Sequence, residues 1–217
     1  MQEHFVHPNI KARYYMLGEL TAKTRYVWIV CHGYGQLARY FIRKFEALKA
    51  PDTVILAPEG LSRFYLEGFS GKVGATWMTR ENRLVEIENY TSYLNSIYEH
   101  IAARVQPETK VIVLGFSQGT ATVCRWVLHQ DLAIHHLVLW AGEFPPDIDK
   151  SMAAARLKDL RTSYVFGTGD PFITEERIRT QMERLKELSH SPGVLEFQGG
   201  HDIQAETLER LRMLIFG

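Results

Sequence analysis

The stretch Val111–Thr122, which reads VIVLGFSQGTAT, constrains this chain more than any other. Apolar residues typical of a buried strand lead into Gly115, Ser117 and Gly119, and small residues that favour the start of a helix follow. A strand that turns so sharply into a helix strains the backbone at its middle residue and leaves room only for glycine two residues to either side. The turn exposes the Ser117 hydroxyl at the amino end of a helix, where free N–H groups favour negative charge. We therefore interpret Ser117 as a candidate catalytic nucleophile.

The G-x-S-x-G pattern is weak evidence by itself. With glycine at its average frequency, a random chain of this length contains the pattern with a probability on the order of 0.1. The interpretation therefore depends on whether the rest of the chain supplies a catalytic acid, a base and donors for an oxyanion hole in the right order.

The length and charge of the chain narrow its class. At 217 residues it is expected to form one domain, residues 1–217, with a substantial core. Lys+Arg and Asp+Glu each number 25, so the formal net charge is zero, and neither a nucleic-acid partner nor a polybasic membrane patch is expected. No apolar run approaches the length of about 18 residues that a membrane-spanning helix requires, so we expect no membrane span.

The cysteines and the amino terminus bear on location. Cys31 and Cys124 are too few for a disulfide scaffold and both fall in predicted buried elements, so we expect two reduced, apolar cysteines. The opening residues, MQEHFVHPNI, lack the basic start and apolar stretch of a secretory signal. The sequence therefore favours a cytoplasmic protein.

Predicted strands and helices alternate along most of the chain. Continuous apolar runs, typical of strands covered on both faces, occur at residues 26–31, 53–57, 111–115, 136–140, 163–166 and 194–197. Helical patterns fall between and after them, at residues 38–49, 83–105, 118–129, 152–160, 173–188 and 205–216. Before them, residues 12–20 are typical of one arm of an antiparallel entry hairpin. The alternation predicts an α/β fold, a three-layer sandwich around a mostly parallel sheet.

Residues 61–82 interrupt this alternation, because they have no sustained period and are rich in glycine and aromatic residues. A long irregular segment inside a compact domain is usually functional, so we expect a loop that lines a substrate pocket. The candidate walls of that pocket are Phe64, Tyr65, Phe69 and Trp77. The alternative is that these aromatic side chains only hold the loop against the body of the protein.

Four predicted strands end in polar or glycine-rich loops. These loops are His32–Gln36, the Ser117 turn, Gly167–Pro171 and Gly199–Asp202. In open α/β sheets, ligands bind at the carboxyl ends of the strands, so we expect the four loops to converge. They supply a serine, an aspartate and a histidine in that chain order, which is the order of the triad in α/β-hydrolases.

Each residue of this constellation has a chemical role. Ser117 needs a base to take its proton, and His201 is suited to accept that proton and return it to the leaving group. Asp170 would hold the imidazole in the required tautomer and stabilise the imidazolium ion. The backbone N–H groups of Gln118 and Tyr34 would form the oxyanion hole. Removing one such donor typically costs about 3 kcal/mol of transition-state stabilisation.

Other residues compete for these roles. Asp147, Asp149 and Asp202 lie near the proposed acid or base in sequence, and we expect Asp202 to cap the final helix. His32 is interpreted as a residue that shapes its loop rather than as the base. The histidines, cysteines and carboxylates have no spacing typical of a metal site, so no metal is expected.

Six short motifs are spread over nearly the whole chain: HGYGQ, APEG, GATWM, GFSQGTAT, GTGDPFI and GGHDI. With these motifs the chain resembles the phospholipase/carboxylesterase group of α/β-hydrolases, which includes bacterial carboxylesterases and acyl-protein thioesterases. The resemblance implies an α/β-hydrolase fold without a large cap domain, hydrolysis of carboxylic esters or thioesters, and no cofactor. It also implies the same nucleophile, acid, base and oxyanion donors as the reasoning above.

The chain departs from the family pattern near the expected substrate site. Gln36 stands where the family often has aspartate after H-G-x-G, and Trp77 is followed by Met78-Thr79 rather than by Phe-Asp. These positions lie where the acyl and alcohol groups should bind. The departures therefore leave the substrate open and do not affect the expected chemistry.

The expected function is that of a serine esterase, which hydrolyses a small-molecule ester or thioester through an acyl-enzyme intermediate. One alternative is an acyltransferase or a peptidase on the same fold, since a fold does not determine an activity. The other is a binding protein without catalytic activity. The acyl chain length, the choice between ester and thioester, regulation and the oligomeric state, including a homodimer, stay open.

Overall fold

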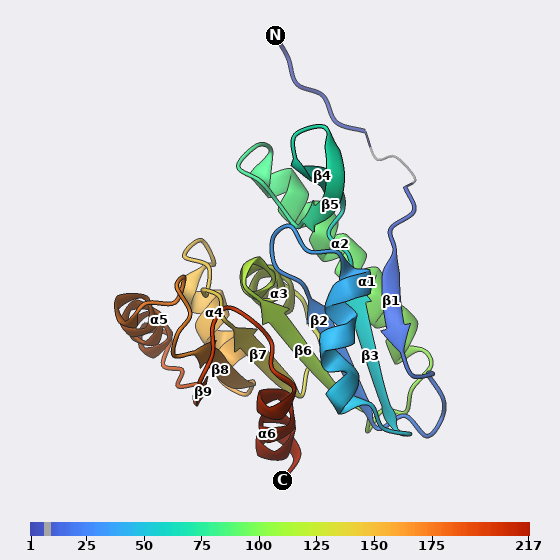
Figure 1. The fold of residues 1–217 in the computed structure, drawn as a ribbon, viewed down its shortest axis with the longest axis vertical. Helices are drawn as coiled ribbons and strands as arrows, with labels where there is room; N and C mark the ends of the chain where they lie inside the picture. Colours follow the sequence, from blue (N-terminus) through green and yellow to red (C-terminus); the bar gives the residue numbers. More distant parts are fainter. Residues whose placement is uncertain (7–9) are drawn as a thin grey trace.

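The computed structural model describes residues 1–6 and 10–217 and is built around a seven-stranded sheet (Figure 1). The strand order is β1-β3-β2-β6-β7-β8-β9. The strands are β1 Tyr14–Leu17, β2 Tyr26–Cys31, β3 Thr53–Pro58, β6 Lys110–Phe116, β7 His136–Trp140, β8 Arg161–Gly167 and β9 Gly193–Phe197. Only the edge pair β1–β3 in this sheet is antiparallel, and every other neighbouring pair is parallel.

Helices cover both faces of the sheet. They are α1 Ala38–Phe41, the 3₁₀ helix η1 Ile42–Leu48, α2 Arg83–Ala102, α3 Gln118–His129, α4 Lys150–Leu157, α5 Glu175–Glu187 and α6 Ala205–Phe216. Figure 1 shows α1 and η1 in front of the sheet and α2 behind it. Helix α6 packs against η1, whereas α2 and α4 both pack against α3. The predicted three-layer α/β fold with a mostly parallel sheet is therefore confirmed, and no large cap covers the described chain.

The central strands are apolar along their whole length because both of their faces are covered. In β2 the residues from Val27 to Cys31 are buried, and β3 is buried throughout. The four tryptophans of the chain, which are Trp28, Trp77, Trp126 and Trp140, are all buried in this core. Cys31 and Cys124 are buried and free, as expected from the sequence.

The largest error of the sequence analysis concerns residues 61–82, which are not an irregular loop. They contain a β-hairpin of β4 Ser62–Glu67 and β5 Ser70–Thr76, paired antiparallel. Gly68 in the turn and Gly71 at the start of β5 adopt positive φ angles of 62° and 87°, which glycine tolerates without strain. Most hairpin residues are exposed, so no alternation of apolar and polar residues marked these strands in the sequence.

The amino-terminal strand also differs from the expectation. Strand β1 is short and pairs antiparallel with β3, not with the next strand in sequence, so it is not an arm of an entry hairpin. Two helices also differ from their predicted bounds or type. The pattern at 38–49 forms a short α-helix followed by a 3₁₀ helix, and α2 ends at Ala102 rather than at residue 105.

One buried carboxylate joins the segments around the end of β3. The side chain of Glu59 has no exposed surface, and it accepts hydrogen bonds from Arg13 Nε and Arg63 Nε, each at 2.7 Å. It also accepts a bond from the backbone N–H of Ala38 at 3.2 Å. Burial alone would raise the pKa of Glu59, but the hydrogen bonds from Arg63 and Arg13 hold that pKa below its usual value. Glu59 thus links β1, the hairpin and the start of α1.

We predict that Glu59→Gln lowers the free energy of unfolding by about 2 kcal/mol at neutral pH, because hydrogen bonds to a charged group are lost. The folded-state pKa of Glu59 lies below its unfolded-state value. Its stabilisation is therefore complete above the unfolded-state pKa and is lost as the pH falls through the folded-state pKa. Urea denaturation at several pH values measures the effect. The matched control is Glu46→Gln at an exposed position of η1. Equal stability of the two variants at pH 7 would contradict the role of Glu59.

Candidate active site

Ser117 lies at the junction of β6 and α3 in a strained backbone conformation. Its φ and ψ angles are 54° and −117°, and a positive φ is uncommon for a residue with a side chain. A Cβ at Gly115 would lie 2.3 Å from the carbonyl oxygen of Gly119, and a Cβ at Gly119 would lie 2.2 Å from that of Cys31. Only glycine at both positions lets α3 start this close to β6 and β2. The N–H of Ser117 donates to Trp140 O at 2.9 Å, which holds the turn against β7.

Two backbone N–H groups beside Ser117 are without acceptors. Gln118 is the first residue of α3, and its N–H donates to no acceptor within the described part of the chain. The same holds for the N–H of Tyr34, in the loop that follows β2. This loop lies against the nucleophile, because a Cβ built on Gly33 would lie 3.1 Å from Ser117 Cβ. Both N–H groups are therefore unpaired in the described structure and belong to segments that border Ser117.

His201 and Asp170 form a hydrogen-bonded pair. The distance from His201 Nδ1 to Asp170 Oδ2 is 2.6 Å, and the carboxylate side chain is completely buried. The other carboxylate oxygen, Oδ1, accepts a bond from the N–H of Phe172 at 2.8 Å. The imidazole packs against the rings of Phe116 and Phe172, with centroid distances of 4.9 Å to each. Because Phe116 directly precedes Ser117, its contact with the imidazole places His201 beside the turn.

Contacts between two loops fix the histidine–aspartate pair. The loop after β8 donates from Thr168 N to Phe197 O at 2.9 Å and from Gly169 N to Gly199 O at 2.8 Å. The loop after β9 is held from the other side, because Trp140 Nε1 donates to Asp202 O at 3.0 Å. Asp170 and His201 are 31 positions apart in sequence. They meet because β8 and β9 are parallel neighbours whose carboxyl ends coincide.

The side chain of His32 is buried and bonded to backbone groups on both sides of its ring. Its Nδ1 bonds to Gly33 O at 2.8 Å, and its Nε2 accepts from Gly60 N at 2.9 Å. Both ring nitrogens are therefore occupied, and the bond from Gly60 requires a neutral Nε2. Burial lowers the pKa of His32 to about 4. This agrees with the interpretation of His32 as a residue that shapes its loop.

The four aromatic residues expected to line a pocket are placed differently from one another. Trp77 is buried, and its Nε1 donates to His32 O at 2.8 Å, so it holds the loop after β2 in place. Phe64 packs against Tyr34, with their ring centroids 5.1 Å apart. On the hairpin, Tyr65 is half-exposed and Phe69 is 98% exposed at the turn. The four side chains therefore do not form one wall.

Two glutamines have roles that the sequence did not indicate. The side chain of Gln118 donates to Met78 O at 2.9 Å and accepts from Trp77 N at 3.2 Å, which ties the serine turn to the end of β5. Gln36, at a departure from the family pattern, accepts from Gly33 N at 2.9 Å and shapes the loop that carries Tyr34 N–H. The partner of Gln36 lies in its own loop, whereas the partners of Gln118 are brought to it by the fold.

The competing aspartates have other partners. Asp147 bonds to Arg125, with an Nη2–Oδ1 distance of 2.7 Å, and Asp149 caps α4 by accepting from the N–H of Met152. Asp202 does not cap the final helix, since the residue before α6 is Gln204 and makes no capping bond. Its carboxylate instead accepts from Lys44 Nζ at 2.5 Å and from Ile203 N at 2.8 Å.

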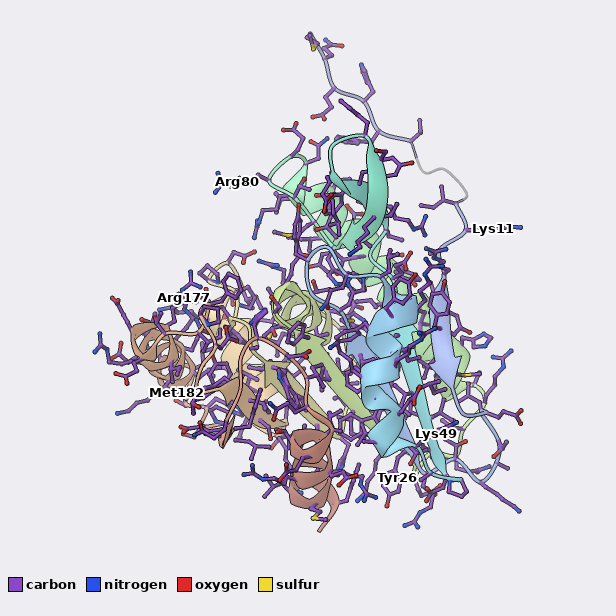
Figure 2. The ribbon with its side chains drawn as sticks, viewed as in Figure 1. Lys11, Tyr26, Lys49, Arg80, Arg177 and Met182 are labelled. Atoms are coloured by element: carbon purple, nitrogen blue, oxygen red, sulfur yellow. The ribbon has the colours of Figure 1, made fainter. Side chains whose placement is uncertain are left out.

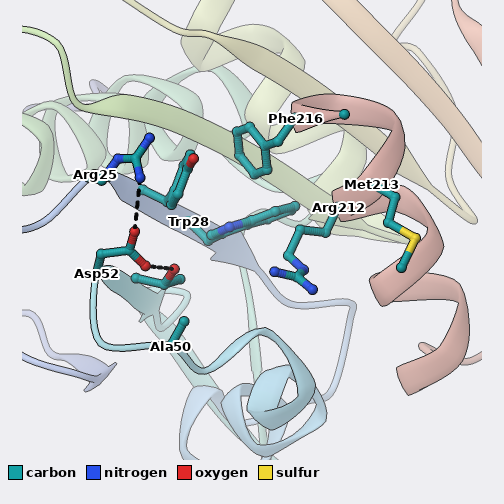
Figure 3. Close-up of a pocket in the computed structure, with 10 residues that line it drawn as sticks. Arg25, Trp28, Ala50, Asp52, Arg212, Met213 and Phe216 are labelled. Atoms are coloured by element: carbon teal, nitrogen blue, oxygen red, sulfur yellow. Dashed lines mark hydrogen bonds and ion pairs between the residues drawn. The ribbon is translucent and has the colours of Figure 1, made fainter.

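A hollow of about 350 Å³ lies at the opposite end of the central strands from Ser117 (Figure 3). It is lined by the first residues of β2 and β3, Tyr26 and Thr53, and by the end of α6. It therefore faces the amino ends of the strands, away from Ser117.

The described residues contain no group of three His, Cys, Asp or Glu side chains arranged to hold a metal ion. None of the described helices is both long and apolar enough to cross a membrane.

Solved structures share this architecture. Esterase PE8 is 20% identical in sequence and has a TM-score of 0.70, with 95% of this chain and 98% of that chain covered. Acyl-protein thioesterase 2 of Zea mays is 16% identical with a TM-score of 0.72, covering 95% and 100% of the two chains. A phospholipase/carboxylesterase from Dyadobacter fermentans is 15% identical with a TM-score of 0.67, covering 95% and 97%. At these identities the likeness establishes the fold.

No curated protein matches the sequence. The sequence profile described as phospholipase/carboxylesterase, in contrast, matches residues 19–215. That range includes the serine turn, both loops of the histidine–aspartate pair and the loop of Tyr34. The chain therefore belongs to the phospholipase/carboxylesterase family of α/β-hydrolases.

Proposed function

We propose that the protein is a serine hydrolase that cleaves carboxylic esters or thioesters through an acyl-enzyme intermediate. The observation that carries this proposal is the 2.6 Å bond between His201 and Asp170 beside the strained turn of Ser117. An imidazole whose Nδ1 is bound to a buried carboxylate presents Nε2 as the free basic nitrogen. In the described structure Nε2 makes no hydrogen bond, to Ser117 or to any other residue, so its lone pair is free to accept a proton.

Acylation begins when Ser117 Oγ attacks the carbonyl carbon and His201 Nε2 takes the hydroxyl proton. The carbonyl oxygen becomes an oxyanion, and the N–H groups of Tyr34 and Gln118 stabilise it. The bond from the carbonyl carbon to the alcohol or thiol then breaks, and His201 gives the proton to that leaving group. The acyl group is left on Ser117 Oγ.

Deacylation repeats these steps with water. His201 Nε2 takes a proton from the water molecule while its oxygen attacks the acyl carbon. The second oxyanion uses the same two N–H groups, and the bond to Ser117 Oγ breaks as His201 returns the proton to that oxygen. The acid product leaves, and the enzyme returns to its starting state. In both halves, Asp170 stabilises the imidazolium ion while His201 carries the extra proton.

We predict that Ser117→Ala lowers kcat for p-nitrophenyl esters by about 10⁴- to 10⁶-fold, because no other group can form the acyl-enzyme. Initial rates with a series of acyl chain lengths, as esters and as thioesters, measure the loss and identify the preferred substrate. The matched control is Ser191→Ala, which removes an exposed hydroxyl and should leave the rate unchanged. Undiminished hydrolysis by Ser117→Ala would refute the proposed nucleophile.

We predict that Asp170→Asn lowers kcat by about 10⁴-fold while the fold is retained, because the amide favours the wrong imidazole tautomer. Steady-state kinetics and circular dichroism measure the two effects. Asp149→Asn serves as the control, since that residue caps α4 and lies outside the proposed machinery. A loss of similar size in both variants would argue against a specific role for Asp170.

We predict that His32 stays neutral, with the proton on Nδ1, from pH 8 to about pH 5, because burial lowers its pKa to about 4. The folded protein therefore binds this proton less readily than the unfolded chain. Stability should fall as the pH drops below the ordinary histidine pKa towards 4. NMR titration of the imidazole nitrogens measures the tautomer directly. Titration of His32 near its ordinary pKa would show that the two ring contacts are not maintained.

A further inference from the structure

We propose that the preferred esters carry a negative charge, a carboxylate or a phosphate, which binds in a pocket between α1 and the β4–β5 hairpin. We call this site the α1–hairpin pocket. It has a volume of about 540 Å³, which is within the range of small-molecule sites. Figure 1 shows the hairpin projecting beyond α1 at one end of the molecule. The inference rests on the proposed function, because the pocket is assigned to the substrate of Ser117.

Two segments that line the α1–hairpin pocket connect it to the loops of the proposed active site. Gly35 and Gln36 line it, and they directly follow Tyr34, whose N–H is a proposed oxyanion donor. Lys44 also lines it and bonds to Asp202, the neighbour of His201 in sequence, at 2.5 Å. The inference places the carbonyl group of the substrate at Ser117 and its acyl chain in this pocket.

The pocket combines an apolar floor with a basic rim. Phe41, Leu66 and Val73 supply apolar surface, and Arg39, Lys44 and Lys72 supply three positive charges. No aspartate or glutamate is among the described residues that line it. The chain as a whole has equal numbers of acidic and basic residues, so this excess is local.

Two of these cations are without a carboxylate partner. Lys44 pairs with Asp202, but Arg39 and Lys72 form no ion pair in the described part of the chain. The guanidinium of Arg39 instead lies over the ring of Tyr40, at 4.5 Å from the centroid. An arginine offers carboxylates and phosphates a pair of parallel N–H donors, and lysine adds a point charge. Unpaired cationic side chains beside an apolar surface attract an anion more strongly than charges scattered over a polar surface do.

The chemistry of the pocket describes one class of substrate. The apolar floor suits a short methylene chain, and the basic rim suits an anion at the end of that chain. Half-esters of dicarboxylic acids and esters of phosphate-bearing acids both have this form. A neutral acyl chain of equal length would bury the same apolar surface and would leave Arg39 and Lys72 without a partner.

The test compares matched substrates. The p-nitrophenyl half-ester of glutaric acid and p-nitrophenyl phosphonobutanoate carry the anion, and p-nitrophenyl pentanoate is the neutral reference. We measure the ratio of kcat/KM for each anionic ester to that for the neutral ester. The wild type is compared with the double variant Arg39→Gln/Lys72→Gln, in which both changed positions are exposed. The control is Lys49→Gln, an exposed lysine at the far end of η1 from the hairpin (Figure 2).

We expect the ratio to fall about tenfold in the double variant and to stay at the wild-type value in Lys49→Gln. High ionic strength should reduce the wild-type ratio towards that of the double variant, because salt screens exposed charges. Comparison of the ratio for the carboxylate ester with the ratio for the phosphonate ester shows which anion the pocket prefers. A ratio that is the same in the wild type and the double variant would overturn the inference.

The neutral ester separates this inference from the proposed function. If Ser117→Ala abolishes hydrolysis of the pentanoate ester and the ratio does not respond to the double variant, the serine mechanism stands and the anion pocket is wrong. If no ester is hydrolysed, the proposed function fails, and binding of glutaric acid monoamide, measured by calorimetry, tests the pocket alone. Equal affinity of the wild type and the double variant for this probe would then refute the pocket.

Discussion

The close approach of β6, α3 and β2 around Ser117 is the constraint on which the rest of the proposed site depends. Glycine at positions 115 and 119 permits it, because a Cβ at either would lie less than 2.5 Å from a backbone carbonyl oxygen. The approach brings the first residue of α3 and the loop after β2 next to the serine. The strain at Ser117, with its φ of 54°, is held in place by the surrounding sheet and its bond to Trp140.

Around this turn, separate parts of the chain are fixed by contacts between loops rather than by one rigid element. The loops that carry Asp170 and His201 bond to each other through the backbone, and Trp140 anchors the His201 loop at Asp202. On the other side, Trp77 and the Gln118 side chain connect the serine turn and the loop of Tyr34 to the end of the hairpin. The end of the hairpin therefore supports the serine turn, and we propose that the α1–hairpin pocket beside it selects the substrate.

The sequence predicted the parts of the fold that follow from burial on both faces and from glycine-rich loops at strand ends. The strands β2, β3 and β6, and the loops carrying Asp170 and His201, were found in this way because each signal is local. The hairpin was missed because most of its residues are exposed and its strands carry no apolar alternation. The role of Asp202 was predicted wrongly because its partner Lys44 lies 158 positions away, which no local pattern reveals. The side chain of Gln118 bonds to residues about 40 positions away, so its partners exist only after the loops converge.

Covalent labelling with a fluorophosphonate, followed by peptide mass spectrometry, tests the assignment of the nucleophile most directly. The reagent reacts with a serine only where a base and oxyanion donors activate it, so one experiment examines the whole arrangement. The proposed mechanism predicts a single adduct on the peptide that contains Ser117, and none on that peptide in Ser117→Ala. An adduct on another residue, or an unmodified Ser117 in folded wild-type protein, would contradict it.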